Sequence, residues 1–453
     1  MALIAAARVG MLGLVRRTLG ARGGAFAMLQ TLVAQGMTMG VNLATGILTA
    51  RMLGPVGRGE FAAASMWLLL PSLLAMSGIQ NGIVYSARVD PARRAGVGFA
   101  GLLLSFVAFV PITAVAWFSL PWLMHGYGAD VLYLSRLCLL AAVVNVLTVV
   151  VRQSLLAEKD FGAYNLLGSA FAAVYLLLLI GLAVAGLINP KTAVEAQIVG
   201  TSMVLLVGLA RLLRGWRGLS RSVSGVVRPL LSYSLRAAPI DLVSVLTGNI
   251  DRLVLIALVS PAEFGLYAVA ISFARIVLIL QTAISAVTLA DLTGQGRAEV
   301  EVFLHRTFRM LMLLLALACG LVLLVDRPLL LLAYGGGFDR AVPIFRVLLV
   351  DAALTCMGQV LMQIYLARGR PGIASAAQVA SFVTTGVGVG LLAVPFGAIG
   401  AAMALVCGSA VRLGVLLFLL PRIELARPSP LPRWSDLTLV LDRVRPMLAR
   451  GSL

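Results

Sequence analysis

The sequence predicts an all-α polytopic membrane protein, with about twelve transmembrane helices in two pseudo-symmetric lobes of six helices each. Hydrophobic residues make up 60% of the 453 residues and charged residues only 12%, about half of the charged share of a soluble domain. Apolar runs of roughly 20 residues, the length that crosses a bilayer, recur from end to end. Two landmarks of the first half also return in the second half at nearly one offset.

The apolar runs define the expected spans, and short connectors rich in polar residues, glycine or proline separate them. We place the spans at 26–50, 61–86, 96–120, 131–156, 163–188, 193–214, 231–260, 263–288, 306–325, 341–366, 372–394 and 397–420. An even number of spans puts both chain ends on one side of the membrane. The expected organisation is a first segment 1–24, a first lobe 25–214, an amphipathic linker 215–230, a second lobe 231–420 and a basic tail 421–453.

Basic residues predict how the chain sits in the membrane. Of the 36 Lys and Arg residues, 26 fall on the side of the N-terminus and seven on the opposite side. Short cytoplasmic loops are enriched in Lys and Arg, so we expect both termini in the cytoplasm. The same asymmetry explains most of the net charge of +18, and we expect no nucleic-acid partner.

Cysteine and histidine placement predicts neither a metal site nor a cofactor. The four cysteines are scattered singly within apolar runs, without a C-x-x-C spacing. Neither His125 nor His305 has Asp, Glu or Cys at metal-ligand spacing. We therefore expect no metal, no disulfide framework and no bound cofactor.

An internal repeat relates the two halves of the chain. LGPVGRGEFAAASMW (53–67) aligns with VSPAEFGLYAVAISF (259–273) at an offset of 206. RQSLLAEKDFGAYN (152–165) aligns with MQIYLARGRPGIAS (362–375) at an offset of 210. The first alignment pairs Pro55 with Pro261 and Gly59 with Gly265. A duplicated unit with an even number of spans predicts a parallel repeat, related by an axis along the membrane normal.

The stretch RMLGPVGRGEF (51–61) has the glycine content of a phosphate-binding loop but not its chemistry. A P-loop ends in Gly-Lys followed by Ser or Thr, and Glu60 and Phe61 stand at those positions. Its counterpart in the second half, SPAEFG, also lacks two of its glycines. We expect a turn between two spans on the outer side of the membrane, where Pro and Gly end one helix and small residues begin the next.

An apolar span followed by LGPVGRGEF and an alanine-rich second span resembles the beginning of polysaccharide-biosynthesis flippases. DRLVLIALVSPAEFGLYAVAISF (251–273) resembles the same element at the start of the second half. These flippases are O-antigen and exopolysaccharide translocators of the MOP superfamily, which also contains MATE drug exporters and lipid II flippases. The resemblance covers roughly residues 25–420.

The resemblance implies two six-helix lobes around a central cavity that opens alternately to each side. It also implies a substrate, undecaprenyl-pyrophosphate carrying a short sugar repeat, that is moved from the cytoplasmic to the periplasmic leaflet. We expect membrane lipids and a polysaccharide polymerase as further partners. The resemblance identifies no catalytic residue, so a transporter is expected rather than an enzyme.

Charged residues inside the expected spans are the candidate functional residues, because charge in a membrane is costly and usually faces a partner or a wet cavity. Asp241, Ser244, Gly248 and Asp251 fall on one helical face. Guanidinium groups match phosphate oxygens, so Arg252 and Arg275 are candidates for binding the pyrophosphate. Asp251, Asp241 and Asp351 are candidates for exchanging a coupling proton or cation, or for structural ion pairs; for Asp241 an interface at the inner end is favoured.

Uncharged polar residues in the spans provide candidates for a sugar path. These are Gln35, Asn42, Asn81, Asn249 and Gln359. Polar residues also hold helices together in lipid, so a purely structural role is the alternative. For Arg412, in the last span, we expect a side chain that extends to the cytoplasmic face.

Two other functions stay open. A MATE-like exporter of organic cations should present acidic residues in its cavity, whereas Arg252 and Arg275 suit an anionic group. An oligosaccharide polymerase or ligase should carry a large outer loop with Arg and His. The longest expected outer loop, about 326–340, has arginines but no histidine.

Overall fold

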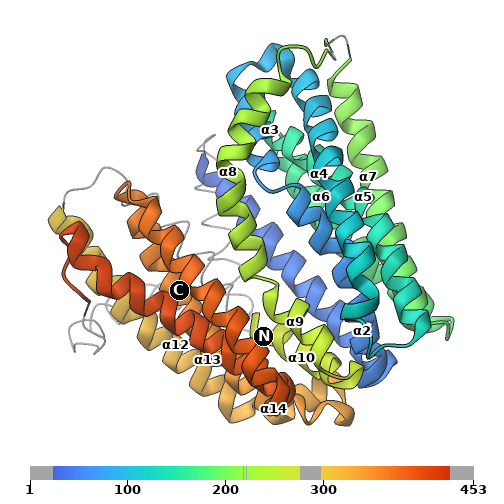
Figure 1. Cartoon of the computed structure of the whole chain (residues 1–453), viewed down its shortest axis with the longest axis vertical. Helices are drawn as coiled ribbons and strands as arrows, with labels where there is room; N and C mark the ends of the chain where they lie inside the picture. The colour runs from blue at the N-terminus through green and yellow to red at the C-terminus, as the bar shows by residue number, and fades with distance from the viewer. Residues whose placement is uncertain (1–23, 218, 221, 276–296, 429–453) are drawn as a thin grey trace, which may run out of the picture.

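The computed structural model describes residues 24–217, 219–220, 222–275 and 297–428, and these are almost entirely helical (Figure 1). The α-helices are α2 (Gly24–Ala75), α3 (Ile79–Val89), α4 (Arg94–Leu123), α5 (Ala129–Ala157), α6 (Phe161–Val184), α7 (Pro190–Gly215), α8 (Val227–Thr247), α9 (Ile250–Leu258), α10 (Pro261–Ala274), α12 (Arg297–Tyr334), α13 (Ala341–Ala367) and α14 (Pro371–Leu419), with 3-10 turns η1 (Pro91–Arg93), η3 (Gly336–Phe338) and η4 (Leu420–Ile423). The expected first segment, the second half of the eighth span and most of the basic tail lie outside the described residues.

Two of the helices each contain a reversal point at a glycine. Gly54 inside α2 has φ 66° and ψ −179°, and Gly397 inside α14 has φ 57° and ψ −137°. A positive φ is favourable for glycine because it has no Cβ. Each long helix therefore joins two expected spans, and the break after Gly54 lies within the stretch expected to form a turn.

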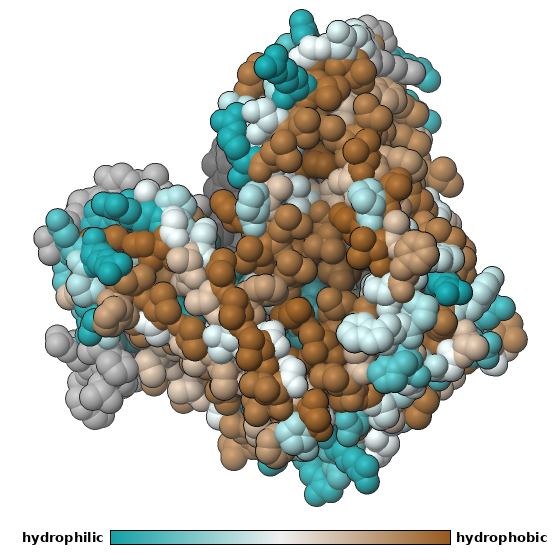
Figure 2. Space-filling model, in the orientation of Figure 1, coloured by the Kyte–Doolittle hydropathy of each residue, from teal (hydrophilic) through white to brown (hydrophobic). Residues whose placement is uncertain are grey.

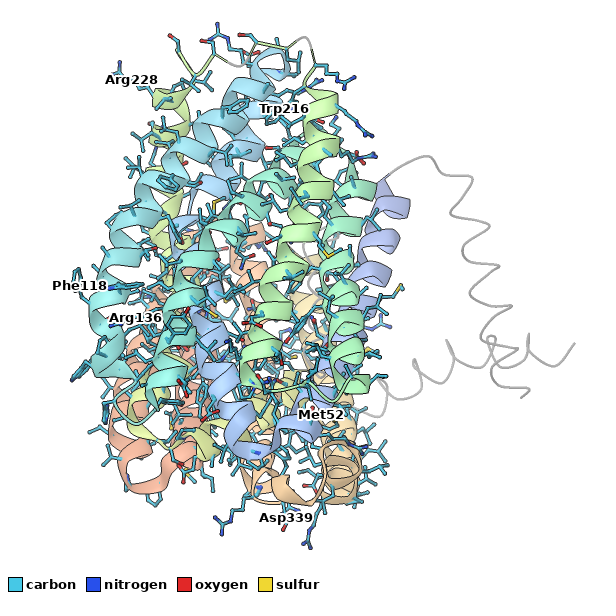
Figure 3. All side chains as sticks on the ribbon, turned by 90° about the vertical axis from the view of Figure 1, so that its right-hand side faces the viewer. Met52, Phe118, Arg136, Trp216, Arg228 and Asp339 are labelled. Atoms are coloured by element: carbon cyan, nitrogen blue, oxygen red, sulfur yellow. The ribbon has the colours of Figure 1, made fainter. Side chains whose placement is uncertain are left out.

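Among the described residues, seven helices are long and apolar enough to cross a membrane, and α2 with α3, bent by 45°, makes an eighth. One of the seven, Pro371–Ile423, includes both halves of α14 around Gly397. Figure 2 shows hydrophobic side chains over the middle of the first lobe, with hydrophilic side chains gathered at its two ends. Phe118, 82% exposed, points outward from this belt (Figure 3). The molecule is a multi-pass membrane protein.

Side-chain caps set the start of several helices. Asp160 accepts the Ala163 N–H at the start of α6, and Ser260 accepts the Glu263 N–H at the start of α10. These hydrogen bonds satisfy donors that a helix leaves unpaired in its first turn. Partial burial of the Asp160 carboxyl is outweighed by hydrogen bonds from Ala163 and Arg211, which hold its pKa below the ordinary value.

The expected seventh span, 231–260, is broken into α8 and α9. Asn249, at the break, has φ −139° and ψ −6°, which ends helical geometry there. Helix α8 packs against α3 and α4 of the first lobe as well as α14, whereas α9 packs mainly on α14 in the second lobe (Figure 1). Tyr233 of α8 stacks on Tyr85 of α3 with ring centroids 4.5 Å apart. The seventh span thus connects the two lobes. In the preceding linker, the described residues between Gly215 and Val227 form no helix, and residues 227–230 already belong to α8.

The two lobes make their closest contact where matched stretches of the repeat cross. A Cβ at Gly59 would lie 1.7 Å from the carbonyl oxygen of Pro261, and one at Gly265 would lie 2.0 Å from that of Pro55. Backbones approach this closely only where small residues leave room. The contact is reciprocal, because residues paired at the offset of 206 face each other across the crossing of α2 and α10. The stretch 51–61 is therefore the junction between the lobes as well as a turn.

Further contacts reinforce this junction. The Arg51 guanidinium donates to the main-chain oxygens of Leu332 and Ala333, the latter at 2.7 Å, at the C-terminal end of α12. A cation is favourable there because the last carbonyls of a helix carry partial negative charge. The lobes meet at the end that carries Met52 and Asp339 and diverge toward the end that carries Arg228 and Trp216 (Figures 1 and 3). Among the described residues, the two lobes are thus in contact at one end and lie apart toward the other.

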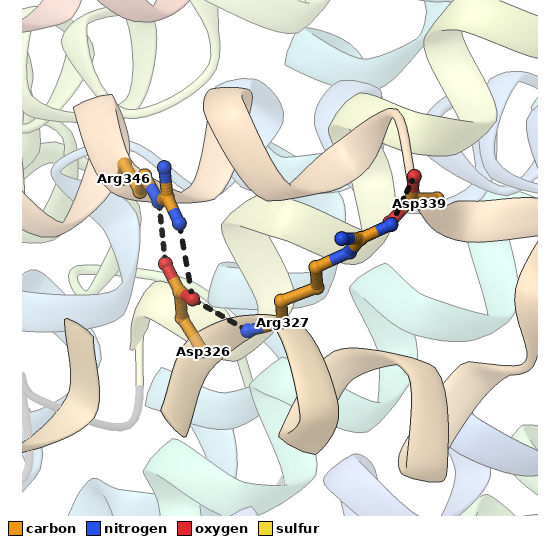
Figure 4. A network of polar contacts seen from close by, with 4 residues as sticks. All are labelled: Asp326, Arg327, Asp339 and Arg346. Carbon is orange, nitrogen blue, oxygen red and sulfur yellow. Dashed lines mark hydrogen bonds and ion pairs between the residues drawn. The ribbon is translucent and has the colours of Figure 1, made fainter. Parts of the chain in front are cut away.

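The expected outer loop 326–340 is largely helical, which corrects the prediction from sequence. Helix α12 continues to Tyr334, and its end is tied to α13 by a charged network (Figure 4). The buried Asp326 accepts Arg346 Nε at 2.6 Å and the Arg327 N–H at 2.5 Å, while the Arg327 side chain pairs with Asp339 at 2.9 Å. Charge-assisted hydrogen bonds of this kind hold the helix where composition alone indicated a loop.

Replacing Gly59 or Gly265 with valine should separate the lobes at the junction. A single Cβ would already overlap a carbonyl oxygen there, and two packed backbones cannot absorb a branched side chain. We expect spin labels at Lys191 and Arg340 to move apart by several ångström, measured by electron–electron resonance in a variant without the native cysteines. Gly320→Val is the control, since nothing lies within 4 Å of its Cβ position. An unchanged distance in Gly59→Val would contradict the proposed role of this contact.

Candidate functional site

A cavity of about 400 Å³ lies between the two lobes, next to the crossing of α2 and α10. Helices α2, α5, α6 and α7 line it from the first lobe, and α9 and α10 line it from the second. Four arginines face it: Arg58 on α2, Arg152 on α5, Arg252 on α9 and Arg275 at the end of α10. Among its described lining residues there is no Asp, Glu or His. This interlobe cavity is therefore strongly positive.

The first-lobe arginines are held by aromatic rings rather than by carboxylates. The guanidinium of Arg58 lies 5.3 Å from the centroid of the Phe61 ring, and that of Arg152 lies 4.7 Å from the Tyr164 ring. Such contacts position a guanidinium without neutralising it. The Nε atoms of both arginines are buried without a hydrogen-bond partner among the described residues. Buried donors of this kind normally find a partner, so these two can receive an anion.

The second-lobe arginines stand at the ends of short helices. Arg252 Nε lies 3.9 Å from a carboxylate oxygen of Asp251, and its Nη2 lies 3.4 Å from the Gly248 carbonyl oxygen. Arg275 follows directly after α10 and also faces a second cavity. The structure thus brings together Arg252 and Arg275, the two residues expected from sequence to bind a pyrophosphate.

A second cavity of about 310 Å³ lies inside the second lobe, among α8, α9, α10, α13 and α14. Asp251, Asp351, Arg275 and Arg412 are its charged lining residues. Each carboxylate accepts a hydroxyl hydrogen bond: Tyr267 donates to Asp251 at 2.5 Å, and Ser409 donates to Asp351 at 2.5 Å. We refer to this as the second-lobe cavity; its carboxylates and guanidiniums balance in number.

Hydrogen bonds connect Arg412 to Asp351. Arg412 Nη2 donates to the Thr355 hydroxyl at 3.1 Å, and the Thr355 and Ser409 oxygens lie 3.1 Å apart. A guanidinium can only donate, and Ser409 gives its hydrogen to Asp351, so Thr355 donates to Ser409. Arg412 is 5% exposed and also donates to Gln378 at 3.3 Å. The expectation that Arg412 extends to the cytoplasmic face is therefore wrong, because these internal acceptors hold it.

Asp241 lies outside both cavities, at the interface between α8 and α3. Its Oδ2 accepts the Gly78 N–H at 2.9 Å and the Asn81 amide at 3.0 Å. Gly78 has φ 75°, and a Cβ there would lie 2.2 Å from the Ser234 carbonyl oxygen. The carboxylate thus sits at the N-terminus of α3, where helix N–H groups favour an anion. Asp241 is therefore placed to hold α8 against the first lobe.

The other polar residues singled out from sequence are dispersed. Gln359 lines the second-lobe cavity. Gln35 and Asn42 are exposed and line neither cavity. Asn249 lines neither cavity and donates to the Val245 carbonyl oxygen at 2.8 Å, closing the end of α8.

Arg58 and Arg152 were not expected at the site. Arg58 lies in the expected outer turn 51–61, and Arg152 lies at the inner end of the expected span 131–156, where it counts among the cytoplasmic basic residues. The structure places both within helices, and Arg58 belongs to the first turns after Gly54. One sequence signal was present: Asn145, Thr148 and Arg152 fall at i, i+3 and i+7, and all three line the interlobe cavity.

Comparison with known proteins identifies the family. The family model described as "Polysaccharide biosynthesis protein" matches residues 27–290, more than half of the 453 residues. The chain belongs to the polysaccharide biosynthesis protein family. No curated protein sequence matches this family member.

Solved structures share the fold of this polysaccharide biosynthesis protein. The lipid II flippase MurJ in an inward closed conformation has a TM-score of 0.74 at 12% identity, over 93% of this chain and 92% of that chain. A multidrug resistance MATE family transporter in an inward-facing conformation has a TM-score of 0.68 at 17% identity, over 86% and 94%. A MOP superfamily transporter from Pyrococcus furiosus has a TM-score of 0.57 at 17% identity, over 87% and 94%. The fold class predicted from sequence is confirmed, and the family match confirms the resemblance to polysaccharide-biosynthesis proteins.

Replacing Asp241 with alanine should loosen α8 from α3. The Gly78 N–H and the Asn81 amide would lose their acceptor, and a hydrogen bond to a charged group contributes about 1.5–3 kcal/mol. We expect the melting temperature in detergent to fall by about 2–5 °C.

Asp90→Ala is the matched control for this substitution. Asp90 forms an exposed ion pair with Arg93 at 3.4 Å, and such pairs contribute only about 0–1 kcal/mol. Equal losses of melting temperature in the two variants would show that Asp241 does not dock α8.

Proposed function

We propose that this chain is a flippase of the bacterial inner membrane that moves undecaprenyl-pyrophosphate-linked oligosaccharide repeat units from the cytoplasmic to the periplasmic leaflet. The moved units would serve assembly of a surface polysaccharide, O-antigen or exopolysaccharide. The observation that carries the proposal is the interlobe cavity, which four arginines and no described acidic residue line. The match to the polysaccharide biosynthesis family supports a sugar-carrying substrate.

The arrangement of the arginines suits a pyrophosphate. Guanidinium groups bind phosphate oxygens through paired hydrogen bonds, and burial strengthens them by lowering the local dielectric. Arg58 and Arg152 come from the first lobe, whereas Arg252 and Arg275 come from the second. An anion between them would contact both lobes, so its binding would depend on how the lobes are set relative to each other. This is the requirement for alternating access.

The conformation supports loading from the cytoplasm. The lobes are in contact at the α2–α10 junction and diverge toward the opposite end. The asymmetry of basic residues assigns that opposite end to the cytoplasm, together with both chain termini. Lipid-linked repeat units made on the cytoplasmic leaflet would enter from this side. Asp251 and Asp351, in the second-lobe cavity, are the proposed groups for a coupling proton or cation.

The alternative is a MATE-like exporter of organic cations. The fold likeness to a multidrug resistance MATE family transporter and the carboxylates of the second-lobe cavity favour it. Against it, Arg275 and Arg412 line the same cavity as Asp251 and Asp351, so a cationic drug would meet positive charge in both cavities. A polymerase or ligase has less support, since the outer segment expected to form its loop is helical.

Replacing Arg58 or Arg152 with alanine should impair export of surface polysaccharide. Each substitution removes hydrogen bonds to an anion, worth about 1.5–3 kcal/mol, which corresponds to roughly a 10- to 100-fold loss of binding. Complementation of cells lacking the gene, at matched protein levels, would measure surface polysaccharide and lipid-linked repeat units in each leaflet. Repeat units should accumulate on the cytoplasmic leaflet.

Arg136→Ala is the matched control, because Arg136 also lies on α5 but contacts the Trp117 ring at 5.0 Å and lines neither cavity. Full export from the Arg58 and Arg152 variants would remove the basis of the proposal. Normal polysaccharide with new sensitivity to cationic dyes in the deletion strain would favour the exporter. Single repeat units on the outer leaflet would favour the polymerase or ligase.

A further inference from the structure

Arg275 stands between the two cavities. Arg275 and Ile271 are the residues that both linings share, so the Arg275 side chain has access to the interlobe cavity and to the second-lobe cavity. The guanidinium of Arg275 forms no hydrogen bond or ion pair with the residues that the structure describes. Its guanidinium is therefore not committed to either side.

The charges on the two sides of Arg275 are opposite. Toward the interlobe cavity stand Arg58, Arg152 and Arg252. Toward the second-lobe cavity stand the carboxylates of Asp251 and Asp351, together with Arg412; the Tyr267 hydroxyl is bound to Asp251. With the interlobe cavity empty, like charges repel Arg275 and the carboxylates attract it. A phosphate anion in the interlobe cavity reverses this balance.

Arg412 cannot make the same exchange. Thr355 and Gln378 bind its two terminal nitrogens, at 3.1 and 3.3 Å. It also packs on Gly358, where a Cβ would lie 3.2 Å from its Nε. Arg412 is therefore a fixed counter-charge in the second-lobe cavity, whereas Arg275 is the arginine there without a partner among the described residues.

We propose that Arg275 exchanges partners, binding either a pyrophosphate group in the interlobe cavity or the Asp251 and Asp351 carboxylates in the second-lobe cavity. When Arg275 turns to the anion, the lining of the second-lobe cavity keeps two carboxylates and one guanidinium, that of Arg412. Arg252 Nε also lies 3.9 Å from Asp251, but Arg252 lines the interlobe cavity, where the anion attracts it as well. One negative charge is then uncompensated, and one monovalent cation, a proton or Na⁺, takes the place that Arg275 leaves. The pyrophosphate and the cation thus bind cooperatively, one for one.

This inference rests on the proposed function, because it takes the pyrophosphate group as the anion. Linkage is reciprocal: if the anion promotes cation binding, the cation raises affinity for the anion by the same factor. With one cation per anion, affinity should rise about tenfold for each tenfold increase in cation concentration while the cation site is unsaturated. The slope of log affinity for the anion against log cation concentration is therefore about one. A residue that only anchors the anion would change the affinity without changing this slope.

The test is calorimetric titration of the purified full-length protein with inorganic pyrophosphate, across a pH series without Na⁺ and across a Na⁺ series at fixed pH. Pyrophosphate changes its own charge with pH, so slopes are compared between variants rather than read singly. In either the pH series or the Na⁺ series, the slope of log affinity for pyrophosphate against log cation concentration should be larger for the wild type than for Arg275→Ala, by about one. The pH series identifies a proton, and the Na⁺ series identifies sodium.

Three variants separate the roles. Arg58→Ala, which faces only the interlobe cavity, should weaken binding and keep the wild-type slope. Asp351→Asn should bind pyrophosphate with the reduced slope of Arg275→Ala. Arg275→Gln keeps a long polar side chain, so it tests the same loss of charge if the alanine variant misfolds. It should show the same reduced slope.

The outcomes separate the two proposals. Weaker binding by Arg275→Ala and Arg275→Gln with the wild-type slope in both series would make Arg275 a simple anchor and overturn the exchange, while leaving the flippase intact. Absence of pyrophosphate binding by the wild-type protein would overturn the interlobe site and the exchange together.

Discussion

The close crossing of α2 and α10 is the constraint on which the rest of the structure depends. Gly59 and Gly265 bring two backbones into contact, and this contact determines where the lobes meet and where they diverge. Arg58 precedes Gly59, so the turn that forms the junction also directs a guanidinium into the interlobe cavity. Arg275 stands at the other end of α10 and reaches both cavities. Closure and charge placement are thus properties of the same two helices.

Charge within the membrane is distributed unevenly between the two cavities. The interlobe cavity holds arginines without acidic neighbours in its described lining, while the second-lobe cavity holds matched carboxylates and guanidiniums. Desolvated charge is costly unless it is paired. The second-lobe cavity meets that cost with its own residues, whereas the described lining of the interlobe cavity supplies no carboxylate for its arginines. In the proposed function, this difference would favour an anion, since a cation would find no acidic side chain among the described lining residues of the interlobe cavity.

The part of the candidate site that could be predicted consists of charges deep inside apolar runs. Arg252, Arg275, Asp251 and Asp351 stand out because lipid tolerates them only with a partner. Arg58 could not be predicted, since it lies near the end of an apolar run, where a loop is equally consistent with the composition. Proline and glycine beside it indicated a turn, and only the kink at Gly54 shows that a helix resumes before Arg58.

Sequence alone determined the fold class. The bilayer sets the hydropathy and length of each span locally along the chain, and the 206-residue offset reflects a duplication. The sequence also showed that Pro55 and Gly59 correspond to Pro261 and Gly265. Only the tertiary structure decided that these matched residues contact each other, that the seventh span divides between the lobes, and that Arg412 turns inward. Those outcomes depend on steric fit and hydrogen-bond partners from distant segments, such as Thr355 and Gln378 around Arg412, which no local pattern encodes.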